Sequence, residues 1–86
     1  MQSRFNVGKL YGTIVEKDLF TGPIGFFIKN SDVRFIGTLE TKTPFVLLTY
    51  DLVVETFYRI KALTPNGETV WFLTHENQIL PFEELV

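Results

Sequence analysis

The residues FYRIKALTPNGETVWFL, numbered 57–73, predict a β-hairpin, because two runs of strand-forming residues flank a Pro-Asn-Gly turn. Two turn geometries compete here. A two-residue type I′ turn would place Asn66 and Gly67 at positive φ, but it would pair Pro65, which has no N–H to donate. A type I turn centred on Pro65 and Asn66, with Gly67 as a left-handed G1 bulge, avoids this conflict. We favour the second geometry.

The G1 turn sets the strand register, in which Ile60 faces Phe72. The other expected pairs are Thr64 with Glu68, Ala62 with Val70, and Tyr58 with Thr74. Since strand side chains alternate between two faces, the expected core face carries Tyr58, Ile60, Ala62, Val70 and Phe72. The opposite face carries Arg59, Lys61, Leu63, Trp71 and Leu73. The I′ register would instead place Phe72 on the side of Arg59 and Lys61, so the G1 register separates apolar from charged residues better.

Trp71 lies on this opposite face, across from Lys61 and one pair away from Arg59. Two interpretations are open. The aliphatic parts of neighbouring side chains, or a loop, could shield the indole. Alternatively, the indole is exposed and docks a partner. In either case a neighbouring cation could lie over its ring.

Composition narrows the class of protein. The chain has 86 residues, enough for one domain over residues 1–86, and 13 of them are aromatic: nine Phe, three Tyr and one Trp. Eight basic and ten acidic side chains give a net charge of −2, which argues against strong binding to a phosphate backbone. The absence of cysteine excludes disulfides and thiolate metal sites. We find no bilayer-length apolar run and no signal-peptide core, so we expect a cytoplasmic protein.

The rest of the chain also predicts short strands. We expect them over residues 7–17, 24–29, 33–40, 45–50 and 79–82. In the first of these, Leu10, Ile14 and Val15 are the core candidates. Residues 18–23 are expected to form a loop with Phe20 at its tip, and residues 51–56 could either extend a strand or turn.

Three local features refine this prediction. Phe35 is expected in the core, Gly37 allows a bulge, and Pro81 marks an edge strand. Residues 74–78 predict one short helical turn, near 75–78, with Thr74 as its N-cap. No segment predicts a longer helix. The fold class is therefore all-β, a small antiparallel barrel of five or six strands.

The C-terminal half resembles SH3-like barrels. The resemblance rests on Tyr58-Arg59-Ile60, Asn66-Gly67-Glu68 and Val70-Trp71-Phe72, followed by residues 75–78 and Ile79-Leu80, with residues 8–12 as the opening strand. It implies a barrel type only. Tyr50-Asp51 does not occupy the place of the ALYDY-like motif and Trp71 lies in the later hairpin strand, so recognition of Pro-rich peptides is not carried over. The small size is similar to that of phage or bacterial accessory proteins.

Catalytic chemistry is not predicted. His75 is the only histidine, and Ile79 stands where a zinc-protease helix would need a second one. Neither serine is flanked by nucleophile-elbow glycines. We therefore expect no enzyme activity, no cofactor, no metal and no small-molecule substrate.

The excess of aromatic residues favours a protein-interaction or structural accessory module, and self-association through exposed aromatics is one form that it could take. We expect its partner-binding residues to be Trp71, Phe27, Phe20, Tyr50, Arg59 and Lys61. The alternative is a nucleic-acid-binding barrel, in which basic residues converge with stacking aromatics. The basic residues would be Lys9, Lys29, Arg34, Arg59 and Lys61, and the aromatics Tyr11, Phe27 and Trp71. We expect no membrane partner.

Overall fold

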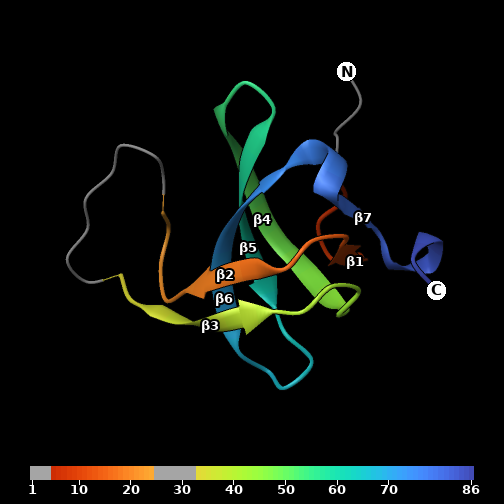
Figure 1. The fold of residues 1–86 in the computed structure, drawn as a ribbon, viewed down its shortest axis with the longest axis horizontal. Coiled ribbons are helices and arrows are strands. Elements are labelled where there is room, and N and C mark those ends of the chain that lie inside the picture. The colour runs from red at the N-terminus through yellow and green to blue at the C-terminus, as the bar shows by residue number, and fades with distance from the viewer. Residues whose placement is uncertain (1–4, 25–32) are drawn as a thin grey trace.

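A computed structural model describes residues 5–24 and 33–86. It contains one antiparallel sheet of seven strands, which curls into a half-barrel (Figure 1). The strands are β1 (Leu10–Thr13), β2 (Lys17–Phe20), β3 (Phe35–Leu39), β4 (Phe45–Val54), β5 (Phe57–Leu63), β6 (Thr69–His75) and β7 (Ile79–Pro81). Two single 3₁₀ turns follow β6 and β7, namely η1 (Glu76–Gln78) and η2 (Phe82–Glu84).

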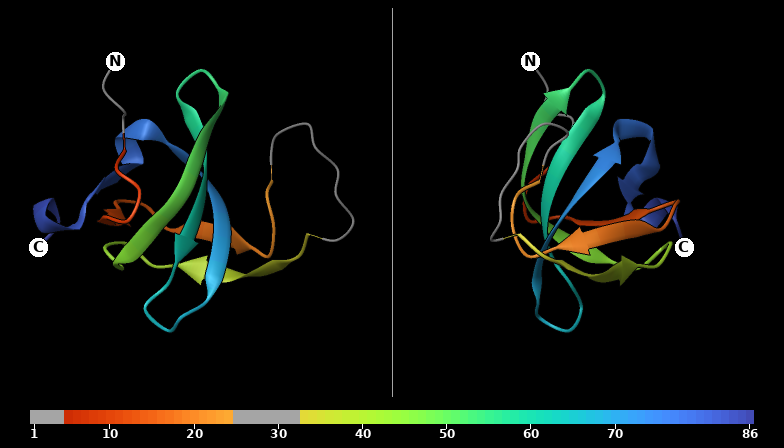
Figure 2. Two further views of the ribbon diagram at one scale, coloured as in Figure 1. Left: turned by 180° about the vertical axis from the view of Figure 1, so that it is seen from behind. Right: turned by 60° about the vertical axis from the view of Figure 1, so that its left-hand side comes forward.

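The strand order is β3-β2-β6-β5-β4-β1-β7, so β3 and β7 form the two edges of the sheet. Figure 2 shows the curl from behind and from the side: β2 and β3 run across the direction of β4, β5 and β6. The all-β prediction is confirmed, and so is the expected position of Pro81 in an edge strand.

The predicted number of strands, five or six, is too low. Residues 7–17 do not form one strand, because the chain bends at residues 14–16 and separates β1 from β2. The bend sends the two halves to different parts of the sheet, where β1 pairs with β4 and β7 while β2 pairs with β6 and β3. At the bend, the N–H of Ile14 donates to the carbonyl of Gln78 at 3.0 Å.

The central hairpin has the predicted G1 geometry. The N–H of Gly67 donates to the carbonyl of Thr64 at 3.0 Å, and Gly67 has a φ of 86°. Asn66 has no positive φ, which excludes the I′ turn. The expected pairs Ile60–Phe72, Ala62–Val70 and Tyr58–Thr74 are all present. The register of this hairpin is therefore confirmed.

The core forms on the predicted face of the hairpin. Ile60, Ala62, Val70 and Phe72 are fully buried, and the ring of Phe45 meets that of Phe72 edge-on at 5.4 Å. The other buried apolar residues are Phe5, Tyr11, Leu19, Leu39, Leu47 and Ile79. These residues come from all seven strands and from the segment before β1, so the curled sheet encloses a single core.

The prediction that Leu10 and Ile14 lie in the core is wrong. Leu10 and Ile14 are each 47% exposed, whereas Tyr11 and Thr13 point inward and are buried. Between them, a Cβ built on Gly12 would lie 2.5 Å from the side chain of Leu85. The C-terminal tail thus packs against the backbone of β1, and the tight fit explains why a glycine occupies this position.

Three further expectations are corrected. Phe20 does not lie at a loop tip but ends β2, and residues 51–54 extend β4 up to a turn at Glu55, whose φ is 50°. The N-cap of η1 is His75 rather than Thr74, because Thr74 pairs with Tyr58 and is buried on the core face. The strand predicted over residues 24–29 lies almost entirely outside the described residues. Within the described part of the chain, no helix has the length and apolar character needed to span a membrane.

Candidate interaction surface

Four side chains form a row across the outer face of the sheet, and we call them the outer aromatic row: Lys61, Trp71, Phe20 and Phe35. Each is the cross-strand partner of the next, so all four lie on the same face of β5, β6, β2 and β3. The Lys61 Nζ lies 5.5 Å from the centroid of the Trp71 ring, and the rings of Phe20 and Phe35 meet edge-on at 5.9 Å. The row begins at a cation and ends at the sheet edge.

The structure brings together three of the six residues predicted to bind a partner, namely Trp71, Phe20 and Lys61. Trp71 is half-buried, and the Lys61 ammonium lies over its ring. Tyr50 lies on the opposite face, where its half-buried ring packs against Phe5. Phe27 lies outside the described residues.

Arg59, the sixth predicted residue, lies on the outer face but its guanidinium is already engaged. It donates to both carboxylate oxygens of Asp51, at 3.2 and 2.6 Å, and to the carbonyl of Ile24 at 3.1 Å. The hydrogen bond to Asp51 is the main cause that raises the pKa of Arg59 above its ordinary value. Arg59 therefore serves to join β4, β5 and the chain after β2.

The sequence reasoning missed the end of the row. Phe35, expected in the core, is instead 59% exposed, and its neighbour Ile36 is 44% exposed. The cause is a bulge in β3: Gly37 pairs with Leu19 and Phe35 with Phe20, which leaves Ile36 as an extra residue. The bulge allows Phe35 to face outward while Leu39 faces the core. The bulge predicted at Gly37 indicated that the alternation of side chains breaks here. Which face Phe35 takes, however, depends on the pairing of β3 with β2.

One edge of β3 carries no described strand. The backbone groups of Arg34 point toward the segment after β2. Its N–H donates to the Thr21 Oγ1 and its carbonyl accepts from the Thr21 N–H, both at 2.9 Å. Because backbone groups of successive strand residues point to opposite edges, the N–H and C=O of Phe35 point toward the free edge. The exposed aromatic ring thus belongs to a residue whose backbone groups point toward the edge that no described strand covers.

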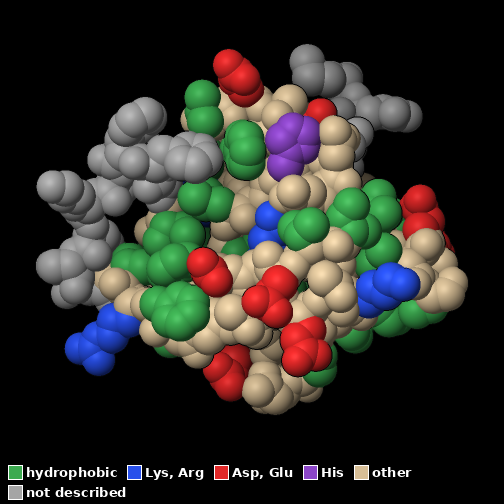
Figure 3. All heavy atoms as spheres, in the orientation of Figure 1, with side chains coloured by type: hydrophobic (Ala, Val, Ile, Leu, Met, Phe, Trp, Pro, Cys, Tyr) green, Lys and Arg blue, Asp and Glu red, His purple; other side chains and the backbone are tan. Residues whose placement is uncertain are grey.

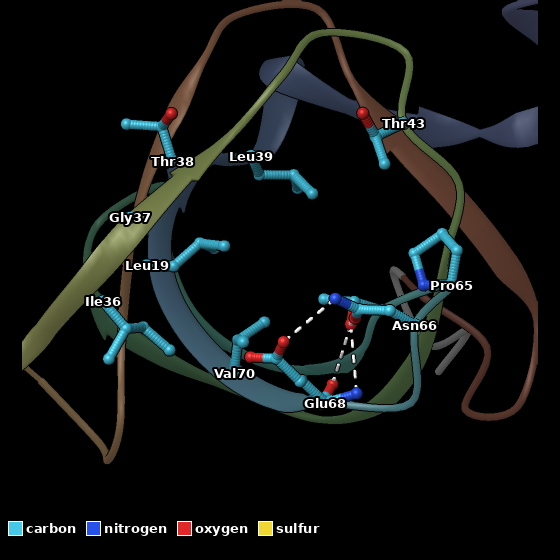
Figure 4. A pocket seen from close by; sticks show the side chains of 11 residues that line it. Leu19, Ile36, Gly37, Thr38, Leu39, Thr43, Pro65, Asn66, Glu68 and Val70 are labelled. Carbon is cyan, nitrogen blue, oxygen red and sulfur yellow. Dashed lines mark hydrogen bonds between the residues drawn. The ribbon is translucent and has the colours of Figure 1, made fainter.

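A hollow of about 410 Å³, which we call the barrel mouth, opens between β3 and the β5–β6 turn (Figure 4). Leu19, Leu39 and Val70 form its apolar floor. Its other lining residues are Ile36, Gly37, Thr38, Thr43, Thr64, Pro65, Asn66 and Glu68. Glu68 is the one charged residue in this lining, and its Oε1 accepts from the Asn66 Nδ2 at 2.9 Å.

Acidic side chains surround the mouth and the neighbouring strands. Figure 3 shows them gathered over β2, β3 and the β5–β6 turn. Glu16, Asp18, Glu40 and Glu68 are exposed in this part of the chain, against two exposed basic residues, Arg34 and Lys42. Lys17 does not offset them at the surface, because its ammonium donates to the Gln78 Oε1 and its burial lowers its pKa. Among the described residues, no group of three or more His, Cys, Asp or Glu could hold a metal ion.

A second exposed apolar group lies at the far end of β4 and β5, away from the mouth. It consists of Leu52, Val54 and Phe57, and the ring of Phe57 meets His75 edge-on at 5.2 Å. His75 is itself engaged, since its Nε2 lies 2.7 Å from the Thr56 Oγ1 and its Nδ1 accepts from the Asn77 N–H at 3.1 Å. The hydrogen bonds of His75 thus give it a structural part in the turn.

Comparison of the chain with protein-family models, with curated proteins and with solved structures found no match. A fold class by itself does not specify function, because one architecture supports many unrelated activities. The surface described above is therefore the guide to function.

Proposed function

We propose that the chain is a non-enzymatic protein-interaction module whose contact surface is the free edge of β3 together with the outer aromatic row. The observation that carries the proposal is the 59% exposure of Phe35 on an edge strand. Natural sheets usually protect their edges with charge, proline, bulges or covering elements, because an open edge pairs readily with another chain. β3 has a bulge, yet Phe35 and Ile36 present exposed apolar side chains there, which favours strand addition by a partner.

We further propose that the half-barrel is of the SH3-like type. Support comes from the order of elements after β5: a hairpin with a G1 turn, the single 3₁₀ turn η1, and the short strand β7, which pairs back onto β1. This proposal concerns architecture alone and transfers no ligand.

The test compares Phe35→Ser with Leu52→Ser, which is matched in exposure because Leu52 is 56% exposed and lies outside the proposed surface. Each variant and the original chain would be studied by sedimentation at micromolar concentration and by capture of proteins from the native host. We expect Phe35→Ser alone to abolish the association, with both variants as stable as the original chain. If both variants, or neither, lost the association, the proposal would be wrong.

The alternative function, nucleic-acid binding, finds less support. Of the basic residues expected to converge, Lys9 pairs with Glu83 at 3.4 Å, Arg59 pairs with Asp51, and Lys61 covers Trp71. Arg34 is exposed, and Lys29 lies outside the described residues. A basic groove would be needed to follow a phosphate backbone, whereas the surface around the mouth is acidic. Binding of a single-stranded oligonucleotide that weakens with salt would favour this alternative.

A further inference from the structure

We infer that the free edge of β3 accepts an extended, basic segment of another protein as an additional strand, with apolar side chains turned into the barrel mouth and Lys or Arg side chains turned outward. The inference rests on the proposed function and specifies its partner. It combines two features that lie side by side: the edge of β3 that no described strand pairs with, and the hollow that Ile36, Gly37 and Leu39 border (Figure 4).

The backbone provides the first part of the recognition. The N–H and C=O of Phe35 point toward the free edge and can pair with an incoming strand, as argued from the hydrogen bonds of Arg34. Such main-chain pairing supplies affinity without selecting a sequence.

The side chains provide selectivity, since those of an added strand alternate between the two faces. Residues on the inner face would reach the floor of the mouth at Leu19, Leu39 and Val70, which suits aliphatic side chains. Residues on the outer face would lie beside Phe35 and near Asp18, the cross-strand neighbour of Thr38. The outer face is acidic, so it suits Lys or Arg.

Charge also decides between a foreign segment and a second copy of this chain. Residues 33–40 carry one basic side chain, Arg34, and one acidic side chain, Glu40. A second β3 would therefore bring no net positive charge to the acidic surface, whereas a segment rich in Lys or Arg would neutralise it.

The test uses the full chain labelled with ¹⁵N and two blocked seven-residue probes, Lys-Val-Lys-Val-Lys-Val-Lys and Glu-Val-Glu-Val-Glu-Val-Glu, at low salt. We expect the basic probe to shift the amide resonances of β3 and of the β5–β6 turn, and to slow hydrogen exchange at Phe35. The acidic probe should leave all of these unchanged. The double variant D18K/E40K should weaken binding of the basic probe at least tenfold, whereas E84K, the same change at an exposed acid beyond β7, should not.

Several outcomes would overturn the inference. These are equal binding of both probes, resonance shifts far from β3, β2 and the turn, or insensitivity to D18K/E40K. If Phe35→Ser abolishes association of the chain while neither probe binds, the proposed function stands, but the inference of a basic partner strand is wrong. A dimer of the original chain that Phe35→Ser dissociates would identify a second copy as the occupant and overturn the inference too. If Phe35→Ser changes no association at all, the proposed function itself fails.

Discussion

Replacing Thr13 by Val should stabilise the protein. Thr13 is fully buried in β1, and its Oγ1 has no hydrogen-bond partner among the described residues. A buried hydroxyl that has lost its water contacts without a replacement destabilises the fold by about 1–3 kcal/mol. Valine has nearly the same shape and is β-branched, so the strand geometry and the packing around residue 13 should persist.

The expected gain in the free energy of unfolding is about 1–2 kcal/mol, taken from the lower part of that range because the new methyl group fits imperfectly. In a domain of this size, 1 kcal/mol raises Tm by about 4–8 °C. Urea unfolding would be followed by the fluorescence of Trp71, the single tryptophan, and by circular dichroism. The midpoint should increase while the m-value stays constant.

Thr74→Val is the matched control. Thr74 is equally buried, but its Oγ1 donates to the carbonyl of His75 at 3.1 Å, so the same change removes an existing hydrogen bond. We expect this variant to be less stable than the original chain by about 0.5–1.5 kcal/mol. If Thr13→Val were no more stable than the original chain, or if both variants shifted in the same direction, the reasoning about Thr13 would be refuted.

Three further changes test other parts of the structure. Gly67 has a φ of 86° and open space around the position of a Cβ, so Gly67→Ala should destabilise the hairpin by about 1–2 kcal/mol through backbone strain alone. Urea unfolding measures this loss, and an unchanged midpoint would contradict the G1 turn. His75→Ala should cost about 1 kcal/mol of thermal stability, while His75→Asn, which keeps an N-cap acceptor, should lose less. Burial lowers the pKa of Lys17, so between its folded pKa and 10.5 the unfolded chain binds more protons and stability should rise with pH. Lys17→Met should remove this rise in urea titrations at alkaline pH.

The sequence was most informative where local chemistry determines geometry. Proline cannot pair in a strand and glycine readily adopts a positive φ, so Pro65 and Gly67 selected one turn, and the turn placed Ile60 opposite Phe72. Trp71 and Lys61 followed from the same register. These residues lie close in sequence, and their placement needs no knowledge of the remaining strands.

The prediction failed where the pairing of strands distant in sequence decides which face a side chain takes. Leu10 and Tyr11 are adjacent and both apolar, and only pairing with β4 and β7 turns Tyr11 inward. Likewise, Phe35 is exposed because the bulge in β3 and its pairing with β2 set its side. The free edge and the barrel mouth could not be predicted at all, since each depends on which strand ends the sheet.

Hydrogen exchange of individual backbone amides tests the account most directly, because the interaction surface depends on an open edge at β3. In the isolated chain, the amide of Phe35 should exchange rapidly, while the amides of Ile60 and Phe72 in the central strands should be strongly protected. Protection of Phe35 equal to that of Ile60 would mean that its N–H is already paired, and would contradict the account.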